Sequence, residues 1–355
     1  TTEPGVITQV LREAVAEKGL LYPVDPSSMG SCWIGGNIAE NSGGARALKY
    51  GVTKDYVLNL EVVLPTGDII WTGANTLKNS TGYNLTQLMI GSEGTLGIVT
   101  KAVLKLIPQN KHNVLLLVPF YKAEQACEAV SAIFRAGLIP SAIEFMERDA
   151  IDRTLKLVTD LNVEVKDDVQ AHLLIEVDGN YPEILMQEAE KILEVVEQFE
   201  IDEVLFADTE DQKNALWKMR RGVAEAVKAN SIYKEEDTVV PRYELPKLLK
   251  GIKEIGSKYG FQSVCYGHAG DGNLHVNIIK GSMTDDNWKT EVPKGIREIF
   301  ALTVSLKGTL SGEHGIGLVQ KNYMNIAFKM IKINLHTPSH KIEIFKNFST
   351  CAHTL

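Results

Sequence analysis

Residues 30–51 read GSCWIGGNIAENSGGARALKYG, with two glycine pairs, Gly35-Gly36 and Gly43-Gly44, set among small polar residues. Backbone N–H groups exposed in such turns can bind phosphate or the polar edge of a planar cofactor. The spacing differs from the GxGxxG dinucleotide fingerprint, and no strand–glycine–helix unit surrounds it. Two tight turns in a surface loop explain the stretch equally well, so alone it leaves a cofactor site and a plain loop open.

A second glycine stretch, IGSEGTLGIVT at residues 90–100, places Gly91, Gly94 and Gly97 at every third position before an apolar run. Glycine at this spacing suits a main chain that lies against a flat ligand. A glycine-rich β-bulge and turn is the alternative. Twelve of the 29 glycines fall between Gly30 and Gly97, so the two stretches support each other as one binding region.

Histidines gather in a third pair of motifs, GHAGDGNLHVNI at residues 267–278 and SGEHGIG at residues 311–317. Two imidazoles and one carboxylate, here His268, His275 and Glu313, are a common ligand set for a divalent transition metal with an open position. Residues 274–278 alternate like a strand, which predicts that His275 and Asn277 face the same side. A single histidine here would more often be structural, but this grouping favours a functional site.

Composition sets the outer limits. The chain has 355 residues, 44% hydrophobic and 23% charged, with a net charge of −8, which excludes a disordered chain and argues against general nucleic-acid binding. No apolar run reaches the length of a membrane-spanning helix. The four cysteines show no spacing typical of a zinc ribbon or a disulfide framework.

Hydrophobic periodicity predicts an α+β protein with a boundary near residues 108–112. Before it, we expect a helix over 6–18, a hairpin from 57–64 and 68–71 around the turn PTG, and a strand over 97–107. After it, strands and single helices alternate in a manner that suits an antiparallel sheet. The expected strands there are 113–118, 142–145, 172–177 and 204–207, and the expected helices are 122–136, 181–199 and 211–229.

The sequence WKMRR, residues 217–221, lies on the helix expected over 211–229. Arg220 or Arg221 could hold a carboxylate through both arms of its guanidinium group. A solvated helix face explains the pattern better when the residues are considered alone. The same applies to Lys234 in YKEED.

Taken together, GSCWIGGNIAENSGG, KNSTGYNLTQLMIGSEGTLGIVT, GHAGDGNLHVNI and SGEHGIGLVQK resemble the FAD-linked D-2-hydroxyacid dehydrogenase family. That family includes D-lactate dehydrogenases, glycolate oxidase catalytic subunits and D-2-hydroxyglutarate dehydrogenases, which are flavoproteins of the vanillyl-alcohol-oxidase type. Four long motifs in the family's order cover about residues 1–325. The resemblance implies part of an FAD-binding domain followed by an α+β cap domain with an antiparallel sheet.

The resemblance also implies roles for individual residues. His268, His275 and Glu313 match metal ligands, for Zn, Mn or Fe, and His314 matches the base. Arg220 and Lys234 match positions that hold the substrate carboxylate, and Asn277 matches a polar residue near the reacting carbon. The residues implied to bind FAD are Pro23, Ser31, Gly35, Gly36, Asn37, Asn41, Gly43, Gly44, Gly51, Glu93, Gly94, Gly97, Ile98 and Val99.

The implied reaction is the oxidation of D-lactate, glycolate or D-2-hydroxyglutarate to the 2-oxo acid. The flavin takes a hydride at N5, and the metal assists deprotonation of the hydroxyl group. The implied electron acceptor is a quinone, a cytochrome or an electron-transfer protein. We expect a cytoplasmic protein, free or peripheral to the membrane, with no nucleic-acid partner and no membrane-spanning segment.

Two departures from the family pattern lead to an alternative. Residues 1–109 match only the second part of an FAD-binding domain, without the first subdomain, and residues 110–328 match the cap domain. Residues 329–355 are basic, with Glu343 as their only acid, and we expect a divergent tail there. The alternative is therefore a truncated, inactive fragment that keeps a metal-binding cap. A flavin-free metallohydrolase ranks last, because it leaves both glycine stretches unexplained.

Overall fold

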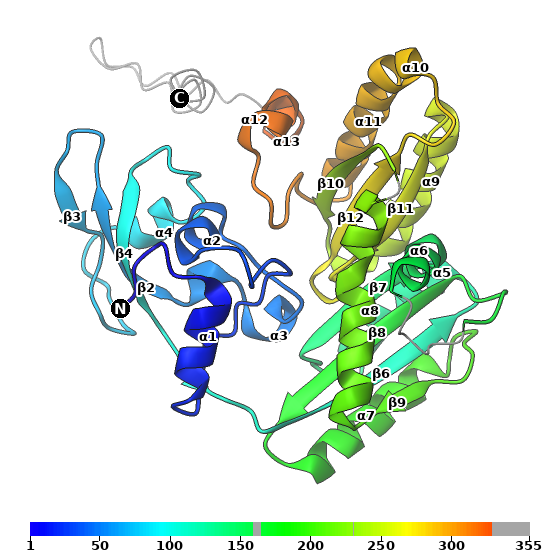
Figure 1. Ribbon diagram of the computed structural model, residues 1–355, viewed down its shortest axis with the longest axis horizontal. Helices are drawn as coiled ribbons and strands as arrows, with labels where there is room; N and C mark the ends of the chain where they lie inside the picture. Colours follow the sequence, from blue (N-terminus) through cyan, green and yellow to red (C-terminus); the bar gives the residue numbers. More distant parts are fainter. Residues whose placement is uncertain (159–164, 230, 329–355) are drawn as a thin grey trace.

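The computed structural model describes residues 1–158, 165–229 and 231–328. The stretch 329–355, for which we expected a divergent tail, lies outside the described residues. Figure 1 shows the N-terminal segment, in blue and cyan, beside a larger green and yellow part that contains most of the strands. Among the described residues, no helix is both long enough and apolar enough to cross a membrane.

The N-terminal part is built on a three-stranded antiparallel sheet in the order β3-β2-β4. The expected hairpin is confirmed as β2 (Val57–Val63) and β3 (Ile69–Trp71), and β4 (Ile98–Leu104) pairs with the other edge of β2. A short pair, β1 (Leu20–Leu21) and β5 (Ile107–Pro108), lies beside it. The helices here are α1 (Thr8–Ala16), α2 (Ile34–Glu40), α3 (Ala47–Tyr50) and α4 (Leu85–Met89).

The glycine pairs of this part do not form two tight turns, which was one of the two interpretations left open by the sequence. Gly35 and Gly36 lie within helix α2, and α2 ends at Asn41 in the left-handed region, at φ 56°. Gly35 is needed because a Cβ there would come within 2.7 Å of Pro4 Cβ. Only the second pair follows the helix as a loop, where Gly44 packs against the backbone of Asp25.

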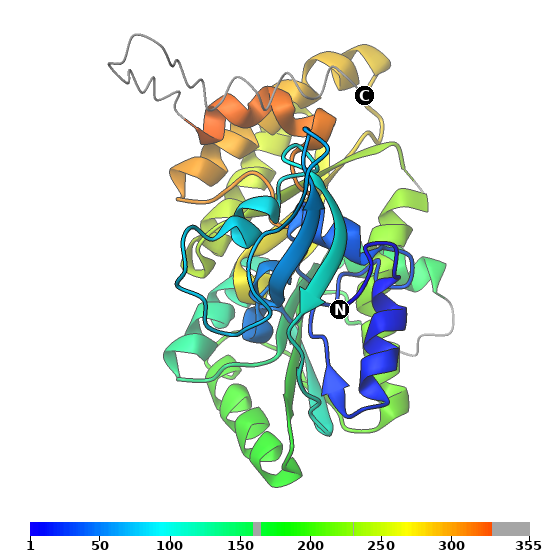
Figure 2. The same cartoon turned by 90° about the vertical axis from the view of Figure 1, so that its left-hand side faces the viewer.

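The larger part is a seven-stranded sheet in the order β10-β12-β11-β7-β8-β6-β9. Each pair of neighbouring strands within it is antiparallel, which confirms the expected α+β class. The strands are β6 (His112–Phe120), β7 (Ala142–Glu147), β8 (Ala171–Gly179), β9 (Leu205–Ala207), β10 (Tyr233–Val239), β11 (Gln262–Gly267) and β12 (Asn273–Ile279). Figure 2 turns the molecule by 90° and shows the N-terminal sheet in front of this larger part.

Helices cover both faces of the seven-stranded sheet. One face packs against α5 (Ala123–Arg135), α7 (Pro182–Val196), α9 (Leu245–Tyr259) and α11 (Val292–Ser305) in the larger apolar cluster. The other face packs against α6 (Arg148–Leu157) and α8 (Glu210–Ala229) in a smaller cluster. The remaining described helices are α10 (Asp285–Thr290), α12 (Gly317–Gln320) and α13 (Met324–Ala327).

Side-chain alternation on β8 shows how the two faces differ. Leu173 and Ile175 point into the larger cluster, which is wholly apolar along this strand. His172, Leu174 and Glu176 point to the opposite face, where two of the three are polar and nearly all their surface is buried. Burying polar groups costs free energy unless they are paired, so the polar side chains on this face, beneath α8, need partners.

Candidate active site

The candidate site lies on the α8 face of the sheet, at β12. Antiparallel register places Asp237 of β10 opposite His275, and Glu235 opposite Asn277. Residues directly opposite in such a pair share a face, so all four side chains lie together, as the alternation in 274–278 predicted for His275 and Asn277. Tyr266 of β11 pairs with His275 from the other side and belongs to the same face.

Three residues of this region could hold a metal ion. Ligand atoms of His268, His275 and Glu313 all lie within 4.8 Å of one another, and His268 Nε2 is 3.4 Å from Glu313 Oε2. Both histidines are buried, and Glu313 Oε1 is buried without a hydrogen-bond partner. Two imidazoles, one carboxylate and an orphaned buried oxygen fit a divalent transition metal.

A second set, Glu235, His275 and His314, meets the same distance criterion. Glu235 is already paired with Lys228 at 3.1 Å, and the His314 side chain is 49% exposed. The first set has two buried histidines and an unpaired carboxylate oxygen, so it is the better ligand cage of the two.

Each buried histidine of the first set has a buried carboxylate behind it. Glu144 of β7 lies 2.8 Å from His268 Nδ1, and Asp237 Oδ1 lies 3.5 Å from His275 Nδ1. The Glu144 carboxylate accepts from His268 Nδ1, fixes the orientation of that ring and leaves Nε2 for a metal, whereas His275 Nδ1 makes no hydrogen bond to Asp237. Asp237 Oδ2 also accepts the backbone N–H groups of Gly312, Glu313 and His314, which holds the Glu313 loop in place.

Neither Glu144 nor Asp237 was recognised from the sequence. Glu144 interrupts an otherwise apolar run, AIEFM, in a strand buried on both faces. A charged residue at such a position needs a partner, so this was a usable signal. Asp237 is the last of three consecutive acids, Glu235 to Asp237, and only the strand register shows which of them meets His275.

Electrostatics acts differently on the two histidines. Burial alone would lower the pKa of His268, but Glu144 and Glu313 raise it well above its ordinary value, so a metal ion would have to displace a proton from this ring. Burial alone would raise the pKa of Glu144, but His268 and Arg220 lower it to about 2. Burial would also raise the pKa of Asp237, but the nearby His275 and His314 hold it below its ordinary value. Burial lowers the pKa of His275 to about 4, so its ring is neutral near pH 7.

Arg220 is buried in the site and does not lie on a solvated helix face. Its Nε is 2.7 Å from Glu144 Oε2, its guanidinium lies over the Tyr266 ring at 5.2 Å, and Nη2 has no hydrogen-bond partner. Arg221 is the exposed member of the pair. Arg220 falls three residues after Trp217 and three before Val223, both buried, and this periodicity could have identified it.

Asn277 and Lys234, both expected in the site, are separated by strand geometry. Asn277 is fully buried, and neither its Nδ2 nor its Oδ1 has a hydrogen-bond partner. Lys234 lies opposite Ile278, whose side chain belongs to the larger apolar cluster on the other face. Because successive strand residues point to opposite faces, the structure does not bring Lys234 to Asn277 and His275.

His314 lies at the open side of the cluster. Its ring stacks on His275, with centroids 5.4 Å apart and planes at 18°. Its Nδ1 is 3.9 Å from Asp237 Oδ2, too far for a hydrogen bond, and half of the side chain is exposed. An imidazole placed between buried carboxylates and solvent is suited to accept and release a proton.

The residues expected to bind FAD fall in segments that the fold brings together. Gly91 donates its N–H to Ile38 O at 2.9 Å, and Glu93 to Ala39 O at 3.0 Å, so the 91–94 turn lies against the end of α2. Gly36 and Gly94 have open space where a Cβ would stand, and Ile98 is 63% exposed. Accessible main chain next to exposed apolar surface fits a planar cofactor.

Several of the other expected FAD residues have roles within the protein. The Asn37 amide donates to Thr8 Oγ1, Asn41 Oδ1 accepts from Lys54 N, and Glu93 accepts from Ile316 N and Gly317 N. Gly51 and Gly97 lie tightly against Asp55 and the Val62–Val63 strand. Of the remaining members, Pro23 is buried, Ser31 is exposed, and Val99 pairs with Val62 in the sheet.

Comparison with known families agrees with this arrangement. A family profile described as "FAD linked oxidases, C-terminal domain" matches residues 109–337, and one described as "FAD binding domain" matches residues 1–73. The chain is 42% identical to the glycolate oxidase subunit GlcD of Bacillus subtilis, covering 93% of this chain and 69% of that protein. It is 38% identical to a D-lactate dehydrogenase of Anaerostipes hadrus, covering 91% and 68%.

Solved structures share the fold at lower identity. An alkyldihydroxyacetonephosphate synthase aligns with a TM-score of 0.65 at 19% identity, over 87% of this chain and 59% of that one. A 4-ethylphenol oxidase from Gulosibacter chungangensis aligns with a TM-score of 0.65 at 16% identity, over 88% and 68%. The fold is of the vanillyl-alcohol-oxidase type, as the motifs implied.

An FAD-binding domain joined to an oxidase cap defines a flavoprotein oxidoreductase. The chain belongs to the FAD-linked oxidase family, and the resemblance inferred from its motifs is confirmed.

Proposed function

We propose that this chain oxidises a small D-2-hydroxy acid to the 2-oxo acid, with FAD as hydride acceptor and a divalent metal ion held by His268, His275 and Glu313. The supporting observation is the convergence of unpartnered buried polar atoms on one face of the sheet, at Arg220 Nη2, both amide atoms of Asn277 and Glu313 Oε1. Relatives named glycolate oxidase subunit, D-lactate dehydrogenase and D-2-hydroxyglutarate dehydrogenase support the substrate class.

The substrate carboxylate would pair with Arg220 through Nη2, the arm that Glu144 leaves free. Because Glu144 occupies Nε, only part of the Arg220 guanidinium is open. This geometry favours a one-armed contact with the substrate carboxylate over a symmetric two-armed contact. Asn277 can donate to and accept from the polar groups at the reacting carbon, since both of its amide atoms are unpaired. These two side chains orient the substrate on a dry, buried surface.

When bound, the flavin supplies the acceptor for the C2 hydride, and the metal supplies the Lewis acidity that lowers the pKa of the hydroxyl. His314 would take the hydroxyl proton and pass it to solvent; its stacking on His275 and its half-exposed side chain support this role. Glu144 keeps Arg220 and His268 oriented while staying ionised. The electron acceptor that reoxidises the flavin is a quinone, a cytochrome or an electron-transfer protein.

The test is to purify the chain, add FAD, pass it through gel filtration and record the visible spectrum. Retained flavin absorbance that is bleached by D-lactate or glycolate, and not by the L-lactate enantiomer, would support the proposal. A colourless protein that binds one metal ion per chain would instead support the inactive fragment and contradict the proposal.

A further inference from the structure

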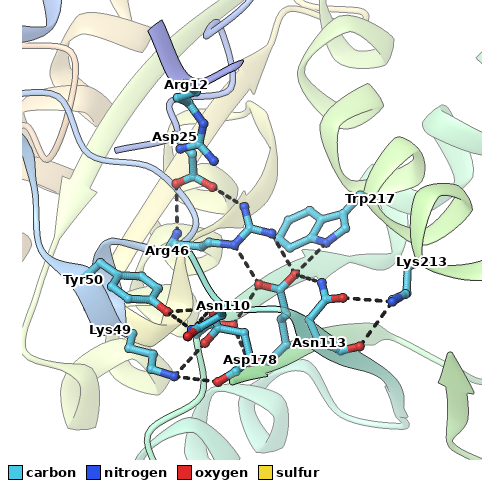
Figure 3. A network of polar contacts seen from close by, with 12 residues as sticks. Arg12, Asp25, Arg46, Lys49, Tyr50, Asn110, Asn113, Asp178, Lys213 and Trp217 are labelled. Carbon is cyan, nitrogen blue, oxygen red and sulfur yellow. Dashed lines mark hydrogen bonds and ion pairs between the residues drawn. The ribbon is translucent and has the colours of Figure 1, made fainter. Parts of the chain in front are cut away.

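One segment of the N-terminal part, residues 43–50, here called the 43–50 segment, includes α3 and contacts the larger part of the molecule. Two ion pairs reach from it to strand β8. Arg46 pairs with Glu176, and Lys49 pairs with Asp178 at 2.6 Å. Tyr50 also donates its hydroxyl to Asp178. Figure 3 shows these contacts side by side.

Arg46 is the best-held residue of the 43–50 segment. Its Nε and Nη2 each lie 2.8 Å from one oxygen of Glu176, and its Nη1 lies 2.7 Å from Asp25. Figure 3 shows Arg46 between Asp25 and Trp217, and its guanidinium lies over the Trp217 ring at 5.4 Å. Such a forked pair fixes direction as well as distance, which a lysine could not do.

Glu176 is itself fixed. It is fully buried, and it accepts further hydrogen bonds from Ser141 and Asn113, and from Trp217 Nε1 at 3.1 Å. All of its partners besides Arg46 come from the seven-stranded sheet and the segments and helix around it. Arg46 is therefore attached to a rigid point on the part of the molecule that carries the histidines.

The 43–50 segment touches both loops that bear the candidate metal ligands. A Cβ at Gly43 would come within 2.8 Å of Glu313 Oε1. Leu48 packs closely on Gly270, where an added Cβ would lie 2.4 Å from Leu48 Cδ2. Gly270 is two residues after His268 in the chain. Arg46 lies between these two contacts along the chain.

We propose that Arg46 is a positioning residue for the metal site: its forked ion pair with Glu176 seats Gly43 against Glu313 and Leu48 against the His268 loop. This inference rests on the metal site proposed above. It extends the set of residues that control metal binding to a side chain outside the ligand cluster, on the opposite part of the molecule.

The experiment measures Zn²⁺ binding to the full chain by titration calorimetry, without FAD. We expect Arg46→Met to weaken Zn²⁺ binding about tenfold or more, the size seen when groups supporting metal ligands are removed. Glu176→Gln keeps the volume of the side chain and leaves Arg46 paired with Asp25. This variant therefore tests the same ion pair if the Arg46→Met protein does not fold. It is expected to weaken binding in the same direction.

Lys49→Met is the matched control, because it removes an ion pair between the same segment and the same strand but touches neither ligand loop. The Lys49→Met variant should keep a Zn²⁺ affinity within about twofold of the unaltered chain. The visible spectrum of bound Co²⁺ should change in the Arg46 and Glu176 variants and not in Lys49→Met. Equal weakening by Lys49→Met would mean a general clamp and overturn the inference. So would unchanged affinity in folded Arg46 and Glu176 variants. A failure of the unaltered chain to bind Zn²⁺ would instead overturn the proposed metal site itself.

Discussion

At the scale of single residues, Glu144 connects the two chemical halves of the site. One oxygen pairs with Arg220 Nε at 2.7 Å and the other lies 2.8 Å from His268 Nδ1. A buried carboxylate with two cationic partners stays ionised, and removing its charge leaves those partners without compensation. It therefore holds both Arg220, the proposed substrate-binding residue, and His268, a proposed metal ligand.

Glu144→Gln should weaken Zn²⁺ binding by about 10-fold to 100-fold, because an amide is a poorer acceptor for the His268 ring N–H. It should also raise KM for the hydroxy acid as Arg220 loses its anchor. Glu147→Gln is the control, since Glu147 is on the same strand but pairs with Lys253, away from the ligands. Calorimetry and steady-state kinetics check both. Equal losses in the two variants would show that the strand, and not Glu144, is responsible.

The buried His172 should make the stability of the fold depend on pH, independently of the candidate active site. It is 2% exposed, its Nδ1 has no partner, and burial lowers its pKa from 6.5 to about 4. The unfolded chain takes up a proton at pH values where the folded one does not, so stability is lost as pH falls from about 6.5 to about 4. The difference in pKa corresponds to about 3 kcal/mol.

His172→Phe should flatten this dependence. Urea unfolding of the unaltered chain and the variant at pH 7 and pH 4.5 measures it, and the difference between the two proteins isolates His172 from other titrating groups. A parallel loss of stability in both proteins would show that His172 contributes nothing to the acid sensitivity.

At the scale of elements, local pattern was enough for some of the site and not for the rest. Alternation in 274–278 predicted β12 and the shared face of His275 and Asn277, because side-chain direction in a strand is a local property. Glu144 and Asp237 could not be assigned as partners, since Glu144 is 124 residues from His268 and the register between strands is set by the whole sheet. Lys234 lies on the opposite face of β10 from Glu235 and Asp237, as strand alternation requires.

Helix α2 offers a test of the proposed cofactor surface. Gly36 is helical and exposed with open space at its Cβ position, so Gly36→Ala should stabilise the chain by about 0.5–1 kcal/mol. If FAD lies on this helix, the added methyl should also weaken FAD binding. Thermal unfolding without FAD and a flavin fluorescence titration separate the two effects. A stabilised variant with unchanged FAD affinity would remove Gly36 from the cofactor surface.

At the scale of the whole molecule, the cluster proposed to bind the metal lies where the two parts meet. Glu313 is held by Asp237 on the sheet side and faces Gly43 on the other, and Glu93 accepts backbone N–H groups just beyond that loop. The boundary expected near residues 108–112 follows the last strand of the N-terminal part, but the sequence carried no signal for these contacts across it, which depend on tertiary packing.

A ligand that binds only the folded chain stabilises it by mass action, so Zn²⁺ at 100 times its dissociation constant should add about 2.7 kcal/mol to the free energy of unfolding. Because the cluster contacts both parts, the increase should appear in one cooperative transition and be reversed by EDTA. His268→Ala should abolish the increase while leaving flavin retention unchanged, since the expected FAD surface at α2 and the 91–94 turn does not include His268. Urea unfolding with and without Zn²⁺ measures the first effect, and gel filtration with added FAD measures the second. Loss of flavin together with the metal would refute the separation of the two sites.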